Sequence, residues 1–378
     1  MKSILFLVPH PIDCSDYRYR AQQFVPYLER AGYRCAIRPF STSRLYSALQ
    51  SKGQLATKVL HMLFCTMRRT LEISGLSRFD LVVINREVFP FFTPWAEKWV
   101  LRLNPRIVFG FDDAIHVGHH DVSQFNHAWL YRFKYGNGVD EVLRRSLHVI
   151  AGNRLLAGYA QRFNSNVSIV PTVVDCSAYV PKPKRQNSTQ PITIGWIGSR
   201  STFHHLFDIE PALKKLAETN PGKVCFRAFG YANGQLDLPD FRSLPFRLDG
   251  EVDYLGSLDI GIMPLPDTEW TRGKCAFKAI QYMAMGIPTV ASPVGITGDI
   301  IHHDVNGLLA TSVDDWFHSL NRLVNDEELR RRVSLRARRT IEDSYSLQVW
   351  GPRLVSLFDH LCGVKLASEA QGLAALKS

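Results

Sequence analysis

The chain has 378 residues, of which 46% are hydrophobic and 21% charged, the balance of a folded protein of about two domains and not of a disordered chain. Its seven scattered cysteines, without a C-x-x-C pair, exclude a disulfide scaffold and a zinc ribbon. The formal net charge of +10 lies in the first half, because residues 1–185 carry 25 lysines and arginines against 13 acids, whereas residues 186–378 carry 20 against 22.

A basic first half indicates an anionic partner, such as lipid headgroups or a phosphorylated acceptor, unless the charge serves only solubility. The first apolar run, Ile4–Val8, ends at Pro9 and is too short for a signal peptide, and no stretch approaches the ~20 apolar residues that span a bilayer. We therefore expect a cytoplasmic protein, with peripheral contact at the inner membrane face left open. No nucleic-acid-binding module is recognised, so nucleic acid is not an expected partner.

The first half alternates short apolar runs with stretches of helical periodicity, which predicts βαβ units and a parallel sheet. The expected strands are Ile4–Val8, Arg34–Ile37, Leu81–Ile84, Ile107–Phe109, His148–Ala151 and Ser168–Val170. The helical stretch Lys52–Arg69 mixes leucines with basic residues, so it either packs on the core or lies on a membrane surface.

A linker is expected at Pro181–Pro191, which has three prolines and no apolar residue. The strand–loop–helix pattern restarts after it over Ile192–Ser199, and further strands are expected at Val224–Phe229, Ile260–Met263, Thr289–Ala291 and Leu308–Ala310. We predict an α/β protein of two Rossmann-like doubly wound parallel-sheet domains, residues 1–185 and 186–344, with a ligand cleft between them. Residues 345–364 should form a helix that crosses back to the first domain, and residues 365–378 a tail.

The segment after Ile260–Met263 carries the main candidate site. Gly273 marks a loop, and a helix is expected to begin near Lys274. Lys274, Lys278 and Gln281 would then lie on one helical face, at i, i+4 and i+7. Backbone N–H groups at a helix start, with lysines in the first turns, suit a diphosphate. The alternative is a solvated lysine face.

Residues 254–310 resemble the C-terminal domain of retaining, glycogen-synthase-like glycosyltransferases of the GT-B fold (group 1, or family 4 type). The matching pieces are Asp259–Leu265, Tyr282–Ser292, Val294-Gly295 and Asp304–Leu309. The resemblance implies a GT-B fold with two Rossmann-like domains. It also implies transfer of a sugar from a nucleotide-diphosphate sugar to an acceptor hydroxyl with retention of configuration, without a cofactor or a metal.

The family usually reads Glu-x(7)-Glu-Ala-Met-Ala-x-Gly-x-Pro, and this chain lacks both glutamates. The second, which binds the ribose in the family, falls on Gln281. The first, which contacts the sugar, falls on Gly273, although Glu269 lies four residues upstream. Glutamine can still bond ribose hydroxyls, whereas glycine has no side chain to contact the sugar.

The resemblance implies a donor site that combines this segment with the small-residue loop expected at Gly195–Thr202. Its expected members are Gly198, Ser199, Arg200, Glu269, Arg272, Gly273, Lys274, Cys275, Lys278 and Gln281. Lys274 and Lys278 would also take part in catalysis, because they would stabilise the charge on the leaving diphosphate.

Polar residues also follow the expected strands of the first half, where ligands of parallel sheets bind. Asp112 and His116 are the catalytic candidates there, since a histidine of this domain contacts the donor sugar in many members of the resembling family. The alternatives are that Asp112 caps a helix and that His116 packs in its loop. The residues expected on the acceptor side are Asp16, Arg18, Arg20, Arg86, Glu87 and Asn153.

His116, His119 and His120 have metal-ligand spacing, but they lack the glutamate of H-E-x-x-H, so no metal is expected. We expect a retaining, hexosyltransferase-type enzyme of glycoconjugate or surface polysaccharide synthesis, acting on a nucleotide sugar and a carbohydrate or lipid-linked acceptor. The missing glutamates leave two alternatives open. One is a non-catalytic sugar-nucleotide- or glycan-binding GT-B protein, and the other is a GT-B nucleotide-sugar hydrolase or epimerase.

Overall fold

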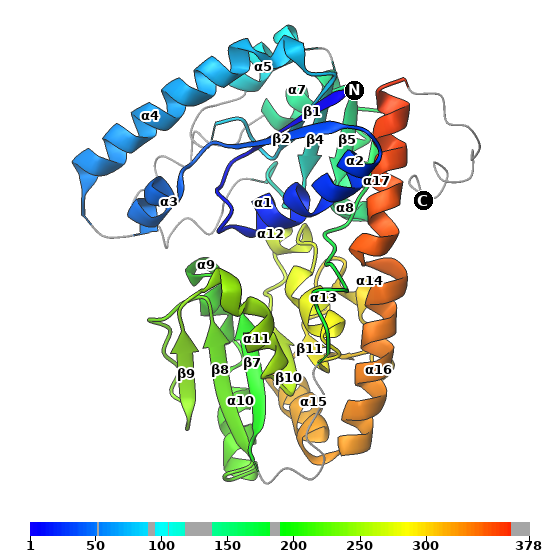
Figure 1. The fold of residues 1–378 in the computed structure, drawn as a ribbon. Coiled ribbons are helices and arrows are strands. Elements are labelled where there is room, and N and C mark those ends of the chain that lie inside the picture. Colours follow the sequence, from blue (N-terminus) through cyan, green and yellow to red (C-terminus); the bar gives the residue numbers. More distant parts are fainter. Residues whose placement is uncertain (51–52, 90–94, 105, 118–137, 182–189, 364–378) are drawn as a thin grey trace. The chain divides into compact units, whose positions relative to one another are not determined.

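The computed structural model describes residues 1–50, 53–89, 95–104, 106–117, 138–181 and 190–363. They divide into two compact units, Met1–Thr172 with Trp350–Ser378, and Val173–Val349. Each unit has its own six-stranded sheet with helices around it (Figure 1). Most of the expected linker (182–189) and the expected tail lie outside the described residues.

The sheet of the first unit has the strand order β2-β1-β3-β4-β5-β6, and every neighbouring pair is parallel. Its strands are β1 (Ser3–Val8), β2 (Arg34–Pro39), β3 (Leu81–Asn85), β4 (Ile107–Phe111), β5 (His148–Ala151) and β6 (Val167–Ile169). The order reverses between β1 and β3, because β2 lies on one side of β1 and all later strands on the other. The loops that follow β1, β3 and β4 are therefore neighbours at the carboxyl edge.

Helices connect these strands, as βαβ units require. They are α1 (Ser15–Arg20), α2 (Val25–Arg30), α3 (Ser43–Gln50), α4 (Leu55–Ser74), α5 (Trp95–Leu103), α7 (Gly138–Arg145) and α8 (Arg154–Ala160), with the short 3₁₀ turns η1 (Gln22–Phe24) and η2 (Leu76–Arg78). The last helix, α17 (Leu347–Leu361), begins in the second unit and continues in the first. Its Asp359 accepts a hydrogen bond from the Tyr33 hydroxyl at 2.6 Å, which fixes it to the first unit.

The sheet of the second unit has the order β12-β11-β10-β7-β8-β9, again all parallel. Its strands are β7 (Ile192–Ile197), β8 (Val224–Phe229), β9 (Phe241–Leu244), β10 (Ile260–Met263), β11 (Thr289–Ala291) and β12 (Leu308–Leu309). Here the order reverses between β7 and β10. The predicted α/β class, with two doubly wound parallel sheets, is thus confirmed.

The helices of the second unit enclose a core around Trp196 and Trp316, both almost fully buried. They are α9 (Arg200–Phe203), α10 (Glu210–Thr219), α11 (Glu251–Gly256), α12 (Glu269–Arg272), α13 (Phe277–Ala284), α14 (Thr297–Ile300), α15 (Val313–Asn325) and α16 (Glu327–Ser344), with the 3₁₀ turns η4 (His204–Leu206) and η5 (Leu248–Gly250). No described helix is both long and apolar enough to cross a bilayer.

The second unit begins at Val173 because Arg338 of α16 holds the segment that follows. Its guanidinium donates to the carbonyl of Cys176 at 3.0 Å and to the carbonyls of Tyr179 and Ala284. The Leu347 amide also donates to the carbonyl of Val174 at 2.8 Å. These bonds attach residues 173–181 to α13 and α16.

Two glycines make the loops after β7 and β8 approach each other closely. Gly230 has φ +110°, and a Cβ atom there would lie 1.9 Å from the carbonyl oxygen of Gly198. The Gly198 amide in turn donates to the carbonyl of Phe229 at 2.9 Å. A side chain at position 230 would therefore push the two loops apart.

We predict that Gly230→Ala costs about 3 kcal/mol or more of unfolding free energy, because it adds both backbone strain and a clash with Gly198. Gly222→Ala is the matched control, since Gly222 has φ +71° and open space around it, so only strain of about 1 kcal/mol is expected. Urea unfolding of both variants measures the difference. Equal losses in the two would show that the loops are not in close contact.

Candidate functional site

The loop after β7 lies at the reversal point of the second sheet. Gly198 follows the strand, and the side chain of Trp196 lies beneath it, because a Cβ at Gly198 would meet the Trp196 ring at 2.3 Å and Lys278 Cε at 2.9 Å. Ser199 and Arg200 are exposed at the start of α9, and Ser199 bonds Ser201 at 2.8 Å. Glycine at position 198 therefore leaves room for the Lys278 side chain.

Lys278 lies in the first turn of α13, a helix that follows β10, and its side chain reaches the loop after the neighbouring strand β7. Its ammonium lies 3.2 Å from Thr202 Oγ1 and 4.9 Å from the centre of the Trp196 ring. Burial and the nearby Lys274 lower the pKa of Lys278 to about 7. No carboxylate among the described residues pairs with it, so the charged form lacks a counter-ion.

His204 and His205 extend this basic cluster. Burial, followed by the positive charges of His204, Lys278 and Lys274, lowers the pKa of His205 to about 3. The two imidazole rings lie 3.9 Å apart. Lys274, Lys278, His204 and His205 form a cluster of basic side chains, which would attract an anion. The sequence analysis missed both histidines. Only their position just after the Gly198 loop could have indicated that they lie near the site.

The expected helical start near Lys274 is wrong. The helix α13 starts at Phe277, and its N-cap residue Ala276 has φ +50°, a left-handed conformation that separates Lys274 from the helix. Lys274 lies in the loop after α12, with its ammonium 5.6 Å from the centre of the Trp270 ring. The two lysines are thus neighbours through a tight turn and not through helical spacing.

Gln281 takes part in a buried network. Only 3% of its surface is exposed, and its amide nitrogen donates to the Tyr179 hydroxyl at 3.0 Å and to a carboxylate oxygen of Glu251. The Tyr179 hydroxyl donates to the same oxygen of Glu251 at 3.3 Å. The amide nitrogen that was expected to reach a ribose is therefore engaged inside the protein, and the sequence analysis did not single out Glu251 or Tyr179.

The other expected donor residues are placed differently. Arg272 is exposed and pairs with Asp267 at 2.6 Å, and Glu269 is exposed as the first residue of α12. Gly273 and Cys275 are buried. The structure therefore brings together Gly198, Lys274 and Lys278, while it leaves Arg272 and Glu269 at the surface.

In the first unit, charged side chains gather after β1, β3 and β4, the neighbouring strands of that sheet. Arg86, which follows β3 with φ +69°, pairs with Asp113, which follows β4, at 2.9 Å. Burial raises the pKa of Asp112, and Asp113 and Asp16 raise it further against the opposing effect of Arg20 and Arg86. The expected juxtaposition of Asp16, Arg86 and Asp112 at one sheet edge is thus present.

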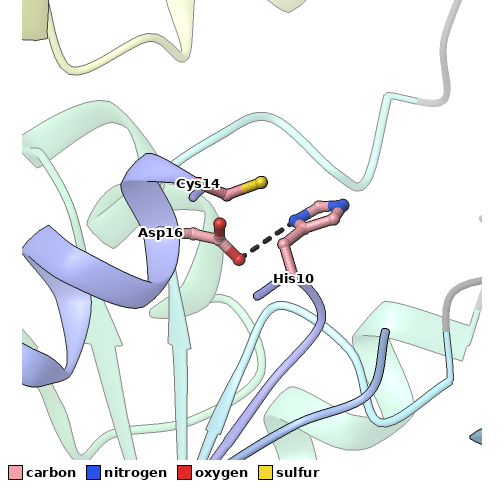
Figure 2. A group of neighbouring side chains, drawn as sticks. All are labelled: His10, Cys14 and Asp16. Atoms are coloured by element: carbon pink, nitrogen blue, oxygen red, sulfur yellow. Dashed lines mark hydrogen bonds and ion pairs between the residues drawn. The ribbon is translucent and has the colours of Figure 1, made fainter. Parts of the chain in front are cut away.

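Asp16 also belongs to a group with His10 and Cys14, which Figure 2 shows side by side. His10 Nδ1 lies 3.1 Å from Asp16 Oδ2, and one donor atom from each of the three residues lies within 4.8 Å of the others. Burial would raise the pKa of Asp16, but His10 and Arg86 outweigh it and lower it. Burial raises the pKa of the Cys14 thiol to about 12.

These three side chains are the described residues with metal-ligand spacing, and imidazole, thiolate and carboxylate are ligands that zinc accepts. The ion pair between His10 and Asp16 and a protonated Cys14 account for the same arrangement without a metal, so we assign none. The histidine triplet cannot be assessed, since His119 and His120 lie outside the described residues.

The remaining first-unit residues make contacts within the unit. Arg20 donates to the carbonyl of Val170 at 2.8 Å, and Arg18 lies 4.8 Å from the centre of the Tyr19 ring. Glu87 is buried next to Arg86. Asn153 is the N-cap of α8, where its side chain accepts from the Leu156 amide at 2.9 Å, so it has a structural role.

His116 is half-buried and stacks on Tyr159, with ring centres 3.7 Å apart and 16° between the planes. This contact matches the packing alternative for His116. Asp112 caps none of the described helices, because residues 112–117 form bends and turns.

Comparison with known proteins agrees with this architecture. Residues 203–326, about a third of the chain, match the family model described as glycosyl transferases group 1. This segment is therefore similar to the glycosyltransferase group 1 family. No curated protein matches the chain.

Solved structures extend the likeness over nearly the whole chain at the level of the fold. HepE of Anabaena, solved in complex with UDP and glucose, has a TM-score of 0.68 at 15% identity and covers 95% of this chain and 100% of its own. Sucrose-phosphate synthase from Thermosynechococcus elongatus has a TM-score of 0.69 at 13% identity, covering 97% of this chain and 100% of its own. A glycosyltransferase from Rickettsia africae has a TM-score of 0.65 at 14% identity, covering 95% and 98%. The predicted GT-B fold is confirmed.

In the second unit, we predict that Gln281→Glu destabilises the fold in a pH-dependent way. The new carboxylate would touch Glu251, so one of the two must stay protonated when folded, with a pKa above its unfolded value. The folded state then binds more protons than the unfolded state, so the loss is small near pH 4 and grows to about 2 kcal/mol at pH 8.

Chemical unfolding across this pH range, relative to the wild-type protein, measures the effect. The exposed Gln235→Glu is the matched control and should change little. A loss that is the same at low and high pH would show that the two carboxylates are not in contact.

Proposed function

We propose that the protein is a retaining glycosyltransferase that moves a sugar from a nucleotide-diphosphate sugar to an acceptor hydroxyl. The observation that carries this proposal is the basic cluster at the β7–β10 reversal, where Lys278 is half-buried beside Lys274 without an acidic partner. A diphosphate would supply the missing negative charge and could also accept bonds from the Gly198 loop. The binding of UDP by HepE, which shares the fold, supports a nucleotide at this unit.

The chemistry needs a leaving group that departs with its negative charge stabilised. The bond from the anomeric carbon to the diphosphate breaks, a bond from the acceptor oxygen forms on the same face, and the acceptor proton passes to a departing phosphate oxygen. Lys274 and Lys278 would stabilise the charge that develops on the diphosphate. We propose that this stabilisation replaces a metal ion, so that no cofactor is required.

The first unit would bind the acceptor. Asp16, Arg86 and Asp112 share the carboxyl edge of its sheet, where carboxylates can orient hydroxyl groups. We propose a carbohydrate or lipid-linked acceptor, and a role in glycoconjugate or surface polysaccharide synthesis on the cytoplasmic side of a membrane. The excess of basic residues in 1–185 supports contact with anionic lipid.

A second candidate function is binding of a sugar nucleotide without transfer. Gly273 provides no side chain for the sugar, and the Gln281 amide nitrogen is bonded to Glu251 and Tyr179. Both features would weaken the hold on the donor sugar more than the hold on the diphosphate.

We predict that Lys274→Ala and Lys278→Ala each weaken binding of a nucleoside diphosphate by about tenfold or more, because each removes a charge-assisted contact. Calorimetry with UDP, GDP and ADP and with the matching nucleosides measures the change, and nucleoside affinity should stay the same. The exposed Lys223→Ala is the control. An equal loss for nucleoside and diphosphate would contradict the proposed role.

The same titration has a second readout. The pKa of Lys278 is about 7, so at pH 8 most of the free protein carries a neutral amine. A bound diphosphate raises that pKa, so binding at pH 8 takes up a proton, and affinity falls as pH rises above 7. Buffers of different ionisation enthalpy report the uptake, which Lys278→Ala should abolish.

We further predict turnover of one radiolabelled donor among UDP-, GDP- and ADP-sugars when acceptors are supplied, with the anomeric configuration of the product retained. Lys278→Ala should lower kcat by about a hundredfold, as loss of an oxyanion-stabilising group does. Tight binding without turnover across varied acceptors would favour the binding protein. Release of free sugar or a changed sugar without acceptor would favour the hydrolase or epimerase.

A further inference from the structure

Helix α4 has its polar and apolar sides reversed relative to an ordinary surface helix. Its outward side carries seven large apolar residues that are 50–72% exposed: Leu55, Val59, Leu60, Leu63, Phe64, Met67 and Leu71. At 100° per residue they occupy about half of the helix circumference. We call this set the apolar face of α4.

The inward side of α4 explains the reversal, because it is held by polar contacts. Arg69 is fully buried and donates to the carbonyls of Val8 at 3.1 Å and Arg38 at 2.9 Å, at the ends of β1 and β2. Arg68 donates to the carbonyls of Pro39 at 2.6 Å and Phe40 at 2.7 Å. These bonds fix the rotation of α4, so its leucines cannot turn inward.

The apolar surface continues onto the two helices that pack against α4. Leu49 of α3 and Trp99 and Leu103 of α5 are also exposed. Figure 1 shows α4 as a long helix at the border of the first unit, with α3 and α5 beside it. A contiguous apolar surface of this kind indicates an interaction site.

The charges around this surface are positive. Arg44 of α3 and Arg102 of α5 are exposed, and the described residues of the three helices include two acids, Glu72 and Glu97. Glu72 faces Arg68 and Arg69, and Glu97 is buried and accepts from the Val88 amide. No acidic group in the described part of these helices lies on the outward side.

A shallow groove adjoins the apolar face between α3 and α4. It is lined by Ser43, Arg44, Ser47, Ala48, Gln54, Thr57 and His61. One arginine, one histidine and three hydroxyl groups, without a carboxylate, match the needs of a phosphate group. Thr57 and His61 lie on α4 within one turn of Leu60 and Phe64, so acyl chains and a headgroup could be contacted together.

We propose that α4 lies in the surface of an anionic bilayer, with its apolar face at the acyl boundary and Arg44, Arg102 and the groove at the lipid phosphates. An interfacial helix has this pattern of an apolar side bordered by cations. A second copy of the chain fits less well, because a two-fold contact through this surface would bring arginines against arginines. This inference specifies the membrane contact proposed above and does not depend on sugar transfer.

The test is sedimentation of the full chain with vesicles of phosphatidylcholine alone and with about one quarter phosphatidylglycerol. Wild-type protein should bind the anionic vesicles at least about tenfold more strongly, and the preference should fall between about 0.1 and 1 M salt. The triple variant Leu63→Gln, Met67→Gln, Leu71→Gln should lose about tenfold or more of the binding.

The matched control replaces three exposed apolar residues of the second unit, Val305, Val313 and Leu335, by Gln and should bind as wild type does. Arg44→Glu with Arg102→Glu should remove the preference for anionic vesicles. Circular dichroism and nucleoside diphosphate affinity, which involves the other unit, confirm that each variant is folded and separate this test from that of the proposed function.

Three results would overturn the inference. The first is no binding to either vesicle. The second is binding that the triple variant leaves unchanged. The third is a dimer, measured by analytical ultracentrifugation without lipid, that the triple variant dissociates, because the apolar face would then be covered by a second copy.

Discussion

The candidate site of the second unit depends on the ammonium of Lys278, which has no carboxylate partner among the described residues. The side chain of Lys278 lies against Trp196 and Thr202, and Gly198, which has no side chain, leaves room for it. An unpaired ammonium that is partly withdrawn from water costs free energy unless it loses its proton or gains an anion. The free protein holds the Lys278 ammonium in this unfavourable environment at the β7–β10 reversal. A bound anion would relieve the unfavourable free energy, which favours anion binding.

The reversal points could be predicted because buried parallel strands are the easiest elements to recognise. β5, β8, β10 and β11 have the predicted bounds, since each is a short apolar run between turn residues. β9 was missed because its residues alternate between half-buried and exposed at the edge of the sheet. Asp112 was found from its place after a central strand, whereas Lys278 was found from its spacing with Lys274 and Gln281 and from the family resemblance.

Side-chain direction was not predictable in the same way. The start of α13 depends on the left-handed conformation of Ala276, which no glycine or proline marks in the sequence. His205 lies in the 3₁₀ turn η4 and Glu251 at the start of α11, and their approach to the site depends on tertiary packing. The sequence of α4 left two placements open, and the backbone carbonyls that bind Arg68 and Arg69 decide which side of the helix faces outward.

The two replaced glutamates are best understood with their surroundings. At position 281 the amide nitrogen donates to Glu251, so the carboxylate of this region belongs to α11 and its hydrogen-bond donor to α13. A glutamate at 281 would oppose Glu251 instead of restoring a family contact. Gln281 is thus one half of a buried hydrogen-bonded pair, and Glu251 supplies the carboxylate that position 281 lacks. Gly273 offers no side chain to a sugar, and its neighbour Lys274 adds to the positive charge near Lys278.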